Sequence, residues 1–293
     1  MGDKIFAKLD NLLITTDGSE FSEGAVREGI RLAKNSGAKV TALYVVEFNP
    51  EFEALAPNLV EKMEIEAAGQ LKGIKEKAVK EGVSCTIFMR RSDSPYKAIV
   101  DEAAGESADV IVMGRRGRTG LKRLLMGSVT AKVIGHARCN VLVVPRAANI
   151  YLRNILIATD GSRYGIEAAS MAVGIAKRSA ANLIAVSVVP SEAAPFIQAE
   201  MQKGLIAEKE LKEAEKNVAA VKAMAQKEGI SAEGIVAAGH LHEAILEIAK
   251  EKNVDLIVVG SHGRTGITRL LMGSVAERVI GHADCAVLVV KAG

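Results

Sequence analysis

The stretch DVIVMGRRGRTGLKRLLMGSVTAKVIGHARCNVLVV at residues 109–144 recurs as DLIVVGSHGRTGITRLLMGSVAERVIGHADCAVLVV at residues 255–290. Of these 36 aligned positions 25 are identical, so the chain is a tandem duplication. The start of each half repeats as well, because LLITTDGS at 12–19 matches ILIATDGS at 155–162. We therefore predict two domains, 1–147 and 148–293, which meet where the sequence after Pro145 interrupts the apolar pattern.

Each half alternates short apolar segments with segments of helical periodicity. In the first half we expect strands at 11–16, 39–46, 84–89, 110–113 and 141–144, separated by helices at 20–36, at 55–80, from 94 and from 127. In the second half we expect strands at 154–159, 182–189, 231–237, 255–260 and 286–290. The last two strands of each half are apolar at successive positions, which indicates a parallel sheet covered by helices on both faces. The predicted fold class is α/β, with two tandem doubly wound sheets of five parallel strands.

The composition excludes several classes of protein. The 38 Lys and Arg residues and 35 Asp and Glu residues give a net charge of +3, and aromatic residues make up only 3% of the 293 positions. This balance argues against a basic nucleic-acid surface or a base-stacking platform. No apolar run approaches the ~20 residues that span a bilayer. Three cysteines without a C-x-x-C spacing are typical of a reducing cytoplasm, so we expect a cytoplasmic protein with no nucleic-acid or membrane partner.

Two loops in each half follow predicted strands at the edge of the sheet where doubly wound proteins bind ligands. The first is Thr16–Ser19, which recurs as Thr159–Ser162. Its aspartate can accept hydrogen bonds from a ribose or a base, or the Asp or Ser can simply cap the next helix. The local sequence leaves both explanations of this first loop open. The second loop is Gly114–Gly120, which recurs as Gly260–Gly266.

The second loop carries a stronger anion-binding signal. Its glycines let the backbone approach a phosphate closely, and the following helix starts at Gly127 and Ser128, or at Gly273 and Ser274 in the second half. Such a start directs free N–H groups and the positive end of the helix dipole at an anion. The loops also carry cations: Arg115, Arg116 and Arg118 in the first half, His262 and Arg264 in the second. Neither loop contains G-x-G-x-x-G or G-x-x-x-x-G-K-[ST], so a dinucleotide fingerprint or a Walker loop is not supported. Tight turns without a ligand are the alternative.

With its doubled G-x2-G-x9-G-[ST] spacing, Asp-Gly-Ser opening and Cys-x-Val-Leu-Val-Val ending, the whole chain resembles two tandem universal stress protein domains. The resemblance implies a Rossmann-like, adenine nucleotide alpha-hydrolase-like fold that binds ATP, ADP or AMP, with Mg²⁺ at the phosphates. It implies that Asp17 and Asp160 contact the adenosine and that Val45 and Val188 line the adenine pocket. The residues thereby assigned to nucleotide binding are Thr16, Asp17, Val45, Gly114, Arg115, Gly117, Gly127, Ser128, Val129, Thr130, Thr159, Asp160, Val188, Gly260, His262, Gly263, Gly273, Ser274 and Val275.

Three classes of function follow. The first is an adenine-nucleotide-binding stress-response or signalling protein with little or no turnover. The second is a slow ATP hydrolase or nucleotide-dependent phosphotransferase, which needs a metal anchor and a group to orient the nucleophile. The sequence offers no second carboxylate that can be placed at the phosphates, and so we identify no catalytic residue. The third is a ligand-free interaction module, against which the glycine motif in both halves argues.

The remaining conspicuous residues have simple structural explanations. His136 and His282 are expected at helix C-termini, where the dipole favours them. Cys139 and Cys285 are expected to open buried strands as small apolar residues rather than as nucleophiles. We expect His240 and His242 on the surface, and the charged segment 208–216 on the solvated face of a long helix.

The last strand of each half, at 141–144 and 287–290, is expected at a sheet edge. An apolar edge strand invites aggregation unless another segment covers it. We therefore expect the two edges to pair within the chain as a pseudo-dimer, with pairing between chains in a homodimer as the alternative.

Overall fold

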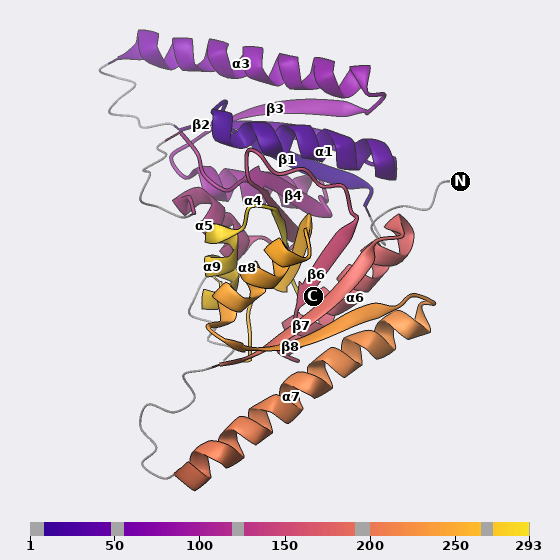
Figure 1. Ribbon diagram of the computed structural model, residues 1–293. Helices are drawn as coiled ribbons and strands as arrows, with labels where there is room; N and C mark the ends of the chain where they lie inside the picture. Colours follow the sequence, from indigo (N-terminus) through magenta and orange to yellow (C-terminus); the bar gives the residue numbers. More distant parts are fainter. Residues whose placement is uncertain (1–8, 48–55, 119–125, 191–199, 265–271, 293) are drawn as a thin grey trace. The chain divides into compact units, whose positions relative to one another are not determined.

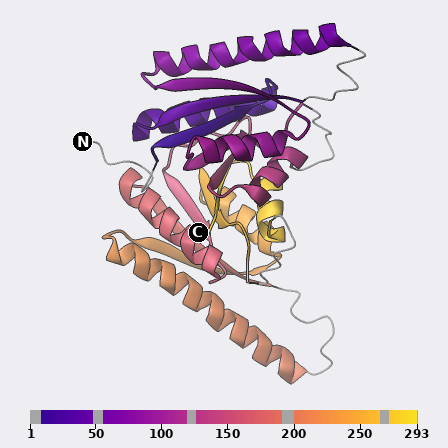
Figure 2. The ribbon, with the colours of Figure 1, turned by 180° about the vertical axis from the view of Figure 1, so that it is seen from behind.

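The computed structural model describes residues 9–47, 56–118, 126–190, 200–264 and 272–292, and of residues 200–207 it describes the backbone alone. The chain divides into two compact units, Met1–Asn149 and Ile150–Gly293. Each unit has a five-stranded parallel sheet with helices on both faces (Figures 1 and 2). The predicted fold class, two doubly wound α/β domains, is confirmed.

In the first unit the strand order is β3-β2-β1-β4-β5, and every pair is parallel. The strands are β1 (Asn11–Thr16), β2 (Lys39–Glu47), β3 (Cys85–Ser92), β4 (Val110–Gly114) and β5 (Asn140–Val144). The helices described are α1 (Glu23–Ser36), α3 (Pro57–Lys80), α4 (Pro95–Gly105) and α5 (Ser128–His136), with a 3-10 turn, η1 (Glu20–Ser22), before α1. The reversal of strand order between β1 and β4 is the switch point at which doubly wound sheets bind ligands.

The second unit repeats this architecture with the order β8-β7-β6-β9-β10, again all parallel. Its strands are β6 (Asn154–Ala158), β7 (Asn182–Pro190), β8 (Ala232–Gly239), β9 (Leu256–Gly260) and β10 (Ala286–Val290). Its helices are α6 (Arg163–Ser179), α7 (Glu200–Lys227), α8 (Leu241–Glu251) and α9 (Ser274–His282).

The helices form two layers in each unit. In the first unit α1 contacts α3 on one side of the sheet, while α4 contacts α5 on the other; in the second unit α6 contacts α7 and α8 contacts α9 (Figure 1). This arrangement follows from right-handed crossovers that change direction after the third strand. It leaves the carboxyl ends of β1 and β4, and of β6 and β9, as neighbouring loop origins.

Burial matches the apolar runs of the sequence. All five residues of β4 are buried, as are all five residues of β10. In the edge strand β3 only Cys85 is buried, and the strand continues to Ser92, three residues beyond the predicted end. Arg90 and Arg91 interrupt the apolar pattern there but still pair in register with Val45 and Val46 of β2, because an edge strand needs no apolar outer face.

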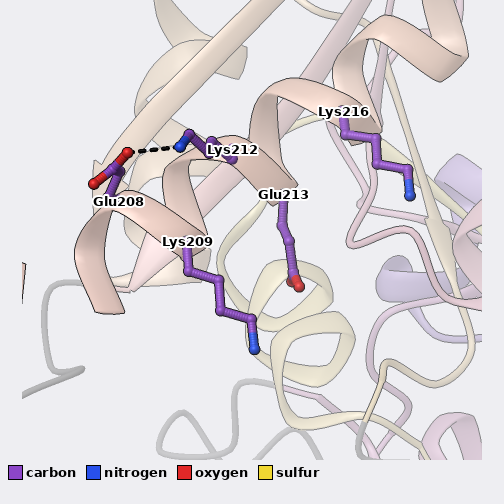
Figure 3. Close-up of a pocket in the computed structure, with 5 residues that line it drawn as sticks. All are labelled: Glu208, Lys209, Lys212, Glu213 and Lys216. Atoms are coloured by element: carbon purple, nitrogen blue, oxygen red, sulfur yellow. Dashed lines mark hydrogen bonds and ion pairs between the residues drawn. The ribbon is translucent and has the colours of Figure 1, made fainter. Parts of the chain in front are cut away.

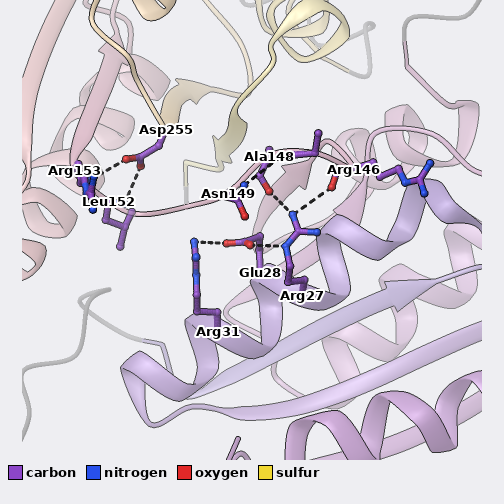
Figure 4. A network of polar contacts seen from close by, with 10 residues as sticks. Arg27, Glu28, Arg31, Arg146, Ala148, Asn149, Leu152, Arg153 and Asp255 are labelled. Carbon is purple, nitrogen blue, oxygen red and sulfur yellow. Dashed lines mark hydrogen bonds and ion pairs between the residues drawn. The ribbon is translucent and has the colours of Figure 1, made fainter.

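A carboxylate before the fourth strand ties down the start of the first strand in each unit. Asp109 accepts backbone N–H bonds from Asp10 and Asn11 at 2.8 and 3.0 Å. Asp255 does the same for Leu152 and Arg153, both at 2.8 Å (Figure 4). These bonds hold the amino ends of the two central strands together, at the edge of the sheet opposite the one where doubly wound proteins bind ligands.

A second polar network holds the end of the first unit against α1. Arg27 donates to the carbonyls of Arg146 and Ala148 and forms an ion pair with the fully buried Glu28, which also pairs with Arg31 (Figure 4). A buried carboxylate needs such partners, because an unpaired charge inside a protein is costly.

Candidate functional site

The two predicted loops of the first unit meet through Asp17, the residue after β1. Its Oδ2 accepts the backbone N–H of Arg118 at 2.7 Å, and its Oδ1 accepts the N–H and hydroxyl of Ser19 at 3.1 and 2.7 Å. The Arg118 Nε also donates to the Asp17 carbonyl at 2.7 Å. Asp17 therefore joins the first loop to the glycine loop, and we call this set of contacts the aspartate clasp.

The aspartate clasp is repeated in the second unit. Asp160 Oδ2 accepts the backbone N–H of Arg264 at 2.8 Å, Oδ1 accepts the Ser162 N–H at 3.0 Å, and Arg264 Nε donates to the Asp160 carbonyl at 2.6 Å. The serine differs between the units, because Ser162 caps α6 by accepting the Gly165 N–H at 3.1 Å, whereas no side chain caps α1. The capping alternative thus applies to Ser162, while both aspartates serve the clasp.

A threonine at the carboxyl end of the first strand, Thr16 in β1 and Thr159 directly after β6, shapes the same loop. Thr16 Oγ1 accepts the Gly18 N–H at 3.0 Å, and Thr159 Oγ1 accepts the Gly161 N–H at 3.3 Å. Both glycines have φ of +75°, a conformation that other residues rarely adopt. The buried threonines therefore orient a tight turn beneath the aspartate.

The motif glycines have steric reasons that the sequence did not reveal. A β-carbon on Gly117 would stand 2.8 Å from Asp17 Oδ2, and one on Gly263 would stand 2.9 Å from Asp160 Oδ2. A β-carbon on Gly114 would stand 2.5 Å from the Phe21 carbonyl oxygen. Gly117 and Gly263 thus make room for the clasp, and Gly114 makes room for the turn η1 that precedes α1.

The third glycine begins a helix whose end faces the glycine loop. Gly127 is the N-cap of α5, donates its N–H to the Arg115 carbonyl at 2.9 Å, and is not joined by a capping side chain. Gly273 is the uncapped N-cap of α9 and donates to the Ser261 carbonyl at 2.9 Å. The N–H groups at such a start have no acceptor within the helix and attract an anion.

The residues after each N-cap divide between exposure and structure. Ser128 and Ser274 are exposed, and Val129 and Val275 are half-buried. Thr130 is buried and donates its hydroxyl to the Gly114 carbonyl at 3.1 Å, so its side chain ties the helix to the end of β4.

The predicted adenine-pocket valines lie at the carboxyl ends of their strands. Val45 pairs with Arg90 on β3, one position beyond Tyr44, which pairs with Thr16, the last residue of β1. Val188 pairs with Ala237 on β8. Both side chains are half-buried. They belong to the same edge of the sheet as the clasp.

Tyr44 is a site residue that sequence reasoning missed. Its hydroxyl donates to the Asp17 carbonyl at 2.8 Å and accepts from the Arg118 guanidinium, whose carbon lies 5.6 Å from the ring centre. Burial raises the pKa of the Tyr44 phenol, Arg118 opposes the rise, and Asp17 and Glu66 add to it. The phenol is therefore neutral at physiological pH. The sequence offered one signal: Tyr44 and Val45 are consecutive residues of a predicted strand, and consecutive side chains of a strand face opposite sides of the sheet.

The loop interiors differ between the units. In the first, the Nε of Arg116 is buried and has no hydrogen-bond acceptor among the described residues. In the second, His262 lies with its Nδ1 3.1 Å from the Ser261 hydroxyl and its ring centre 5.1 Å from that of Tyr164. A buried donor without an acceptor is costly, so Arg116 fits an anionic ligand. Residues 119–125 and 265–271 of the motif lie outside the described residues.

The second unit also has a hollow of about 380 Å³ beside its clasp. Apolar side chains of α6 and α7, Ile166, Ala169, Val221 and Met224 among them, form its walls. Asp160, Glu213, Lys216, Asn217 and Arg264 supply its polar groups.

His240 is exposed as expected, but the His242 side chain is only 15% exposed, so the prediction that it lies on the surface is wrong. His136 and His282 take structural places at the ends of their helices. The Nδ1 atoms of His136 and His282 lie 2.8 Å from the carbonyls four residues earlier in their helices. Burial raises the pKa of Cys285 to about 12, which opposes a nucleophilic role. Among the described residues, no three His, Cys, Asp or Glu side chains are grouped to hold a metal ion. No helix in that part of the chain is long and apolar enough to cross a bilayer.

Comparison with known proteins gives a consistent answer. The model of the Universal stress protein family matches residues 8–145 and 152–291. A universal stress protein of Methanocaldococcus jannaschii is 41% identical over 151 residues, covering 51% of this chain and 87% of that protein. One of Mycolicibacterium smegmatis is 28% identical over 298 residues, covering 96% of both. The crystal structure of a universal stress protein from Archaeoglobus fulgidus has a TM-score of 0.74 over 99% of both chains at 21% identity, which shows the shared fold.

Proposed function

The chain belongs to the universal stress protein family, and we propose that each of its units binds an adenine nucleotide, ATP, ADP or AMP, with little or no turnover. The role that follows is stress response or signalling through nucleotide occupancy. The observation that carries this proposal is the duplicated aspartate clasp beside an uncapped helix N-terminus.

The residues divide between the two ends of a nucleotide. Asp17 and Asp160 lie where the adenosine would be held, with Val45 and Val188 at the neighbouring strand ends. The phosphates would meet the glycine loop and the first N–H groups of α5 or α9, where an uncapped helix start favours an anion. Mg²⁺ would then be bound through phosphate oxygens and water, as this ion prefers.

The clasp also argues for binding rather than hydrolysis. Both oxygens of Asp17 and of Asp160 accept N–H bonds from the protein, so each carboxylate orients the loops of the site, a role that supports binding. Phosphoryl transfer requires a group that positions the nucleophile, and the clasp does not supply one.

The experiment is identification of the ligand that copurifies with the protein. The chain is purified without added nucleotide and denatured, and the released small molecules are identified by mass spectrometry. Calorimetric titration of the stripped protein with ATP and AMP, and release of phosphate from radiolabelled ATP, follow. An adenine nucleotide with negligible release supports the proposal. Absence of binding by any adenine nucleotide contradicts it, and rapid release favours the hydrolase.

We also propose a cytoplasmic location and pairing of the two units through their last strands. The cysteine usage supports the first, and the apolar last strands of the sequence support the second. Cutting the chain between residues 147 and 153 and measuring mass by light scattering tests the pairing. Halves that separate freely at micromolar concentration would refute it.

A further inference from the structure

The arginine of the clasp has a different partner in each unit. Besides their shared bonds to the aspartate, Arg118 binds the neutral hydroxyl of Tyr44, whereas Arg264 Nη1 lies 2.6 Å from the Glu213 carboxylate and 3.7 Å from that of Glu210. The guanidinium of the first unit is thus held by a neutral group, and that of the second unit by an ion pair.

A single difference in the second strand of the sheet accounts for this change. Ser187 of β7 occupies the position of Tyr44, as the 143-residue offset of the repeated first strands places it. The serine is too short to reach the arginine, and the Asn217 amide lies 3.4 Å from its hydroxyl instead. Ser187 therefore does not replace the ring and hydroxyl of Tyr44, and Arg264 instead contacts Glu213 on α7.

The acidic residue itself is present in both units. Glu66 of α3 corresponds to Glu213, because the Glu-Gly pair that follows each of these helices is offset by 147 residues. Glu66 is exposed and close enough to act on the Tyr44 phenol, but the phenol binds the Arg118 guanidinium. Tyr44 therefore keeps Arg118 from the ion pair that Arg264 makes.

We propose that Glu213 is a specificity-determining residue that makes the second site select adenosine or AMP over ATP, whereas the first site selects the polyphosphate. This inference rests on the proposed function. A ligand phosphate that approaches Arg264 must compete with the Glu213 carboxylate and is repelled by it, and the repulsion grows with each phosphate charge. Among the described residues no carboxylate forms an ion pair with the Arg118 guanidinium of the first unit, and the buried Nε of Arg116 offers a further donor.

Other charges on α7 set the size of the effect. Figure 3 shows Lys209 and Lys216 on the same side of the helix as Glu213, while Lys212 pairs with Glu208 on another side at 2.6 Å. The attraction of Lys209 and Lys216 for a ligand phosphate is the same in the unsubstituted chain and in a variant that lacks the Glu213 charge. Substituting Glu213 therefore isolates the contribution of the carboxylate, and Glu208 provides a control with the same charge change on the same helix.

The test is Glu213→Gln in a Gly117→Val background, so that only the second site is read. Adenosine, AMP and ATP are titrated by calorimetry in low-salt buffer with EDTA, because Mg²⁺ would reduce the charge of ATP. We expect the variant to bind ATP roughly threefold to tenfold more tightly, AMP less so, and adenosine unchanged. Glu208→Gln should alter none of the three by as much. A ratio of ATP to adenosine affinity that stays the same in Glu213→Gln would overturn the inference.

The reciprocal variant covers the first site. In a Gly263→Val background, Tyr44→Ser should allow Arg118 to pair with Glu66 and so lower the preference for ATP over adenosine. If the serine variant does not fold, Tyr44→Phe, which keeps the ring but lacks the hydroxyl, takes its place. An unchanged preference in the folded variant contradicts the inference. If both units bind with the same ratio of ATP to adenosine affinity, only the assignment of Glu213 is contradicted. If neither unit binds adenosine, AMP or ATP, the proposed function is contradicted as well.

Discussion

The carboxylate of Asp17 stands 2.8 Å from the position that a β-carbon would take on Gly117. Real β-carbons essentially never come so close to another heavy atom, so any side chain at position 117 must displace the aspartate or the loop. The same relationship holds between Asp160 and Gly263 at 2.9 Å. The glycine and the aspartate are therefore one structural unit, and a change in either reaches the proposed ligand through the other.

Asp17→Asn should destabilise the first unit. Both carboxylate oxygens accept N–H bonds, so an amide places its own NH₂ against one of these donors. Leaving a donor unpaired costs about 1–3 kcal/mol. Urea unfolding measures the loss, and Asp101→Asn on the exposed side of α4 is the control. Equal midpoints for the two variants would show that the clasp does not stabilise the unit.

Gly69→Ala should stabilise the protein. Gly69 lies within α3, and a β-carbon there would meet no atom within 4 Å. Alanine in place of glycine inside a helix gains about 0.5–1 kcal/mol. The urea midpoint should rise accordingly, and a fall would contradict the prediction.

His242→Tyr should flatten the loss of stability in mild acid. Burial lowers the pKa of His242, with Arg278, His282 and His240 adding to the decrease and Glu243 opposing it. The unfolded chain therefore takes up this proton near the ordinary value of 6.5 while the folded chain does not, and stability falls as the pH drops through that value.

Tyrosine is the natural comparison at this position, because the duplicated segments place Tyr96 at the equivalent site of the first unit. Thermal midpoints measured from pH 7.5 to pH 5 should fall less steeply in His242→Tyr than in the unsubstituted chain. Parallel curves would contradict the assignment.

The fold could be predicted from the sequence because the apolar segments that form the buried strands recur in both halves of the chain. Apolar residues at successive positions of Val110–Met113 and Val141–Val144 indicated buried parallel strands, and both strands lie there. The edge strand β3 was underestimated at its end, because charged residues hide pairing that involves only the backbone.

The candidate site could be predicted only in outline. The sequence identified Asp17 and the glycine loop, but it attributed Gly117 to the approach of a phosphate, whereas the structure places the aspartate against it. Tyr44 was missed because its role depends on the register of β2 against β1. Glu213 was assigned to a solvated helix face, and its exposure gives no sign of an arginine 51 positions away in the chain.

The central claim is that each unit binds one adenine nucleotide at its aspartate clasp. Its most direct test is the stoichiometry of ATP and of AMP binding, each measured by calorimetry on the unsubstituted chain, on Gly117→Val, on Gly263→Val and on the double variant, with circular dichroism to show that each is folded. A valine at either position clashes with the clasp carboxylate and blocks the loop. We predict one nucleotide per unit in the unsubstituted chain, loss of one site in each single variant and of both in the double variant. Unchanged ATP binding by the folded double variant would contradict the account.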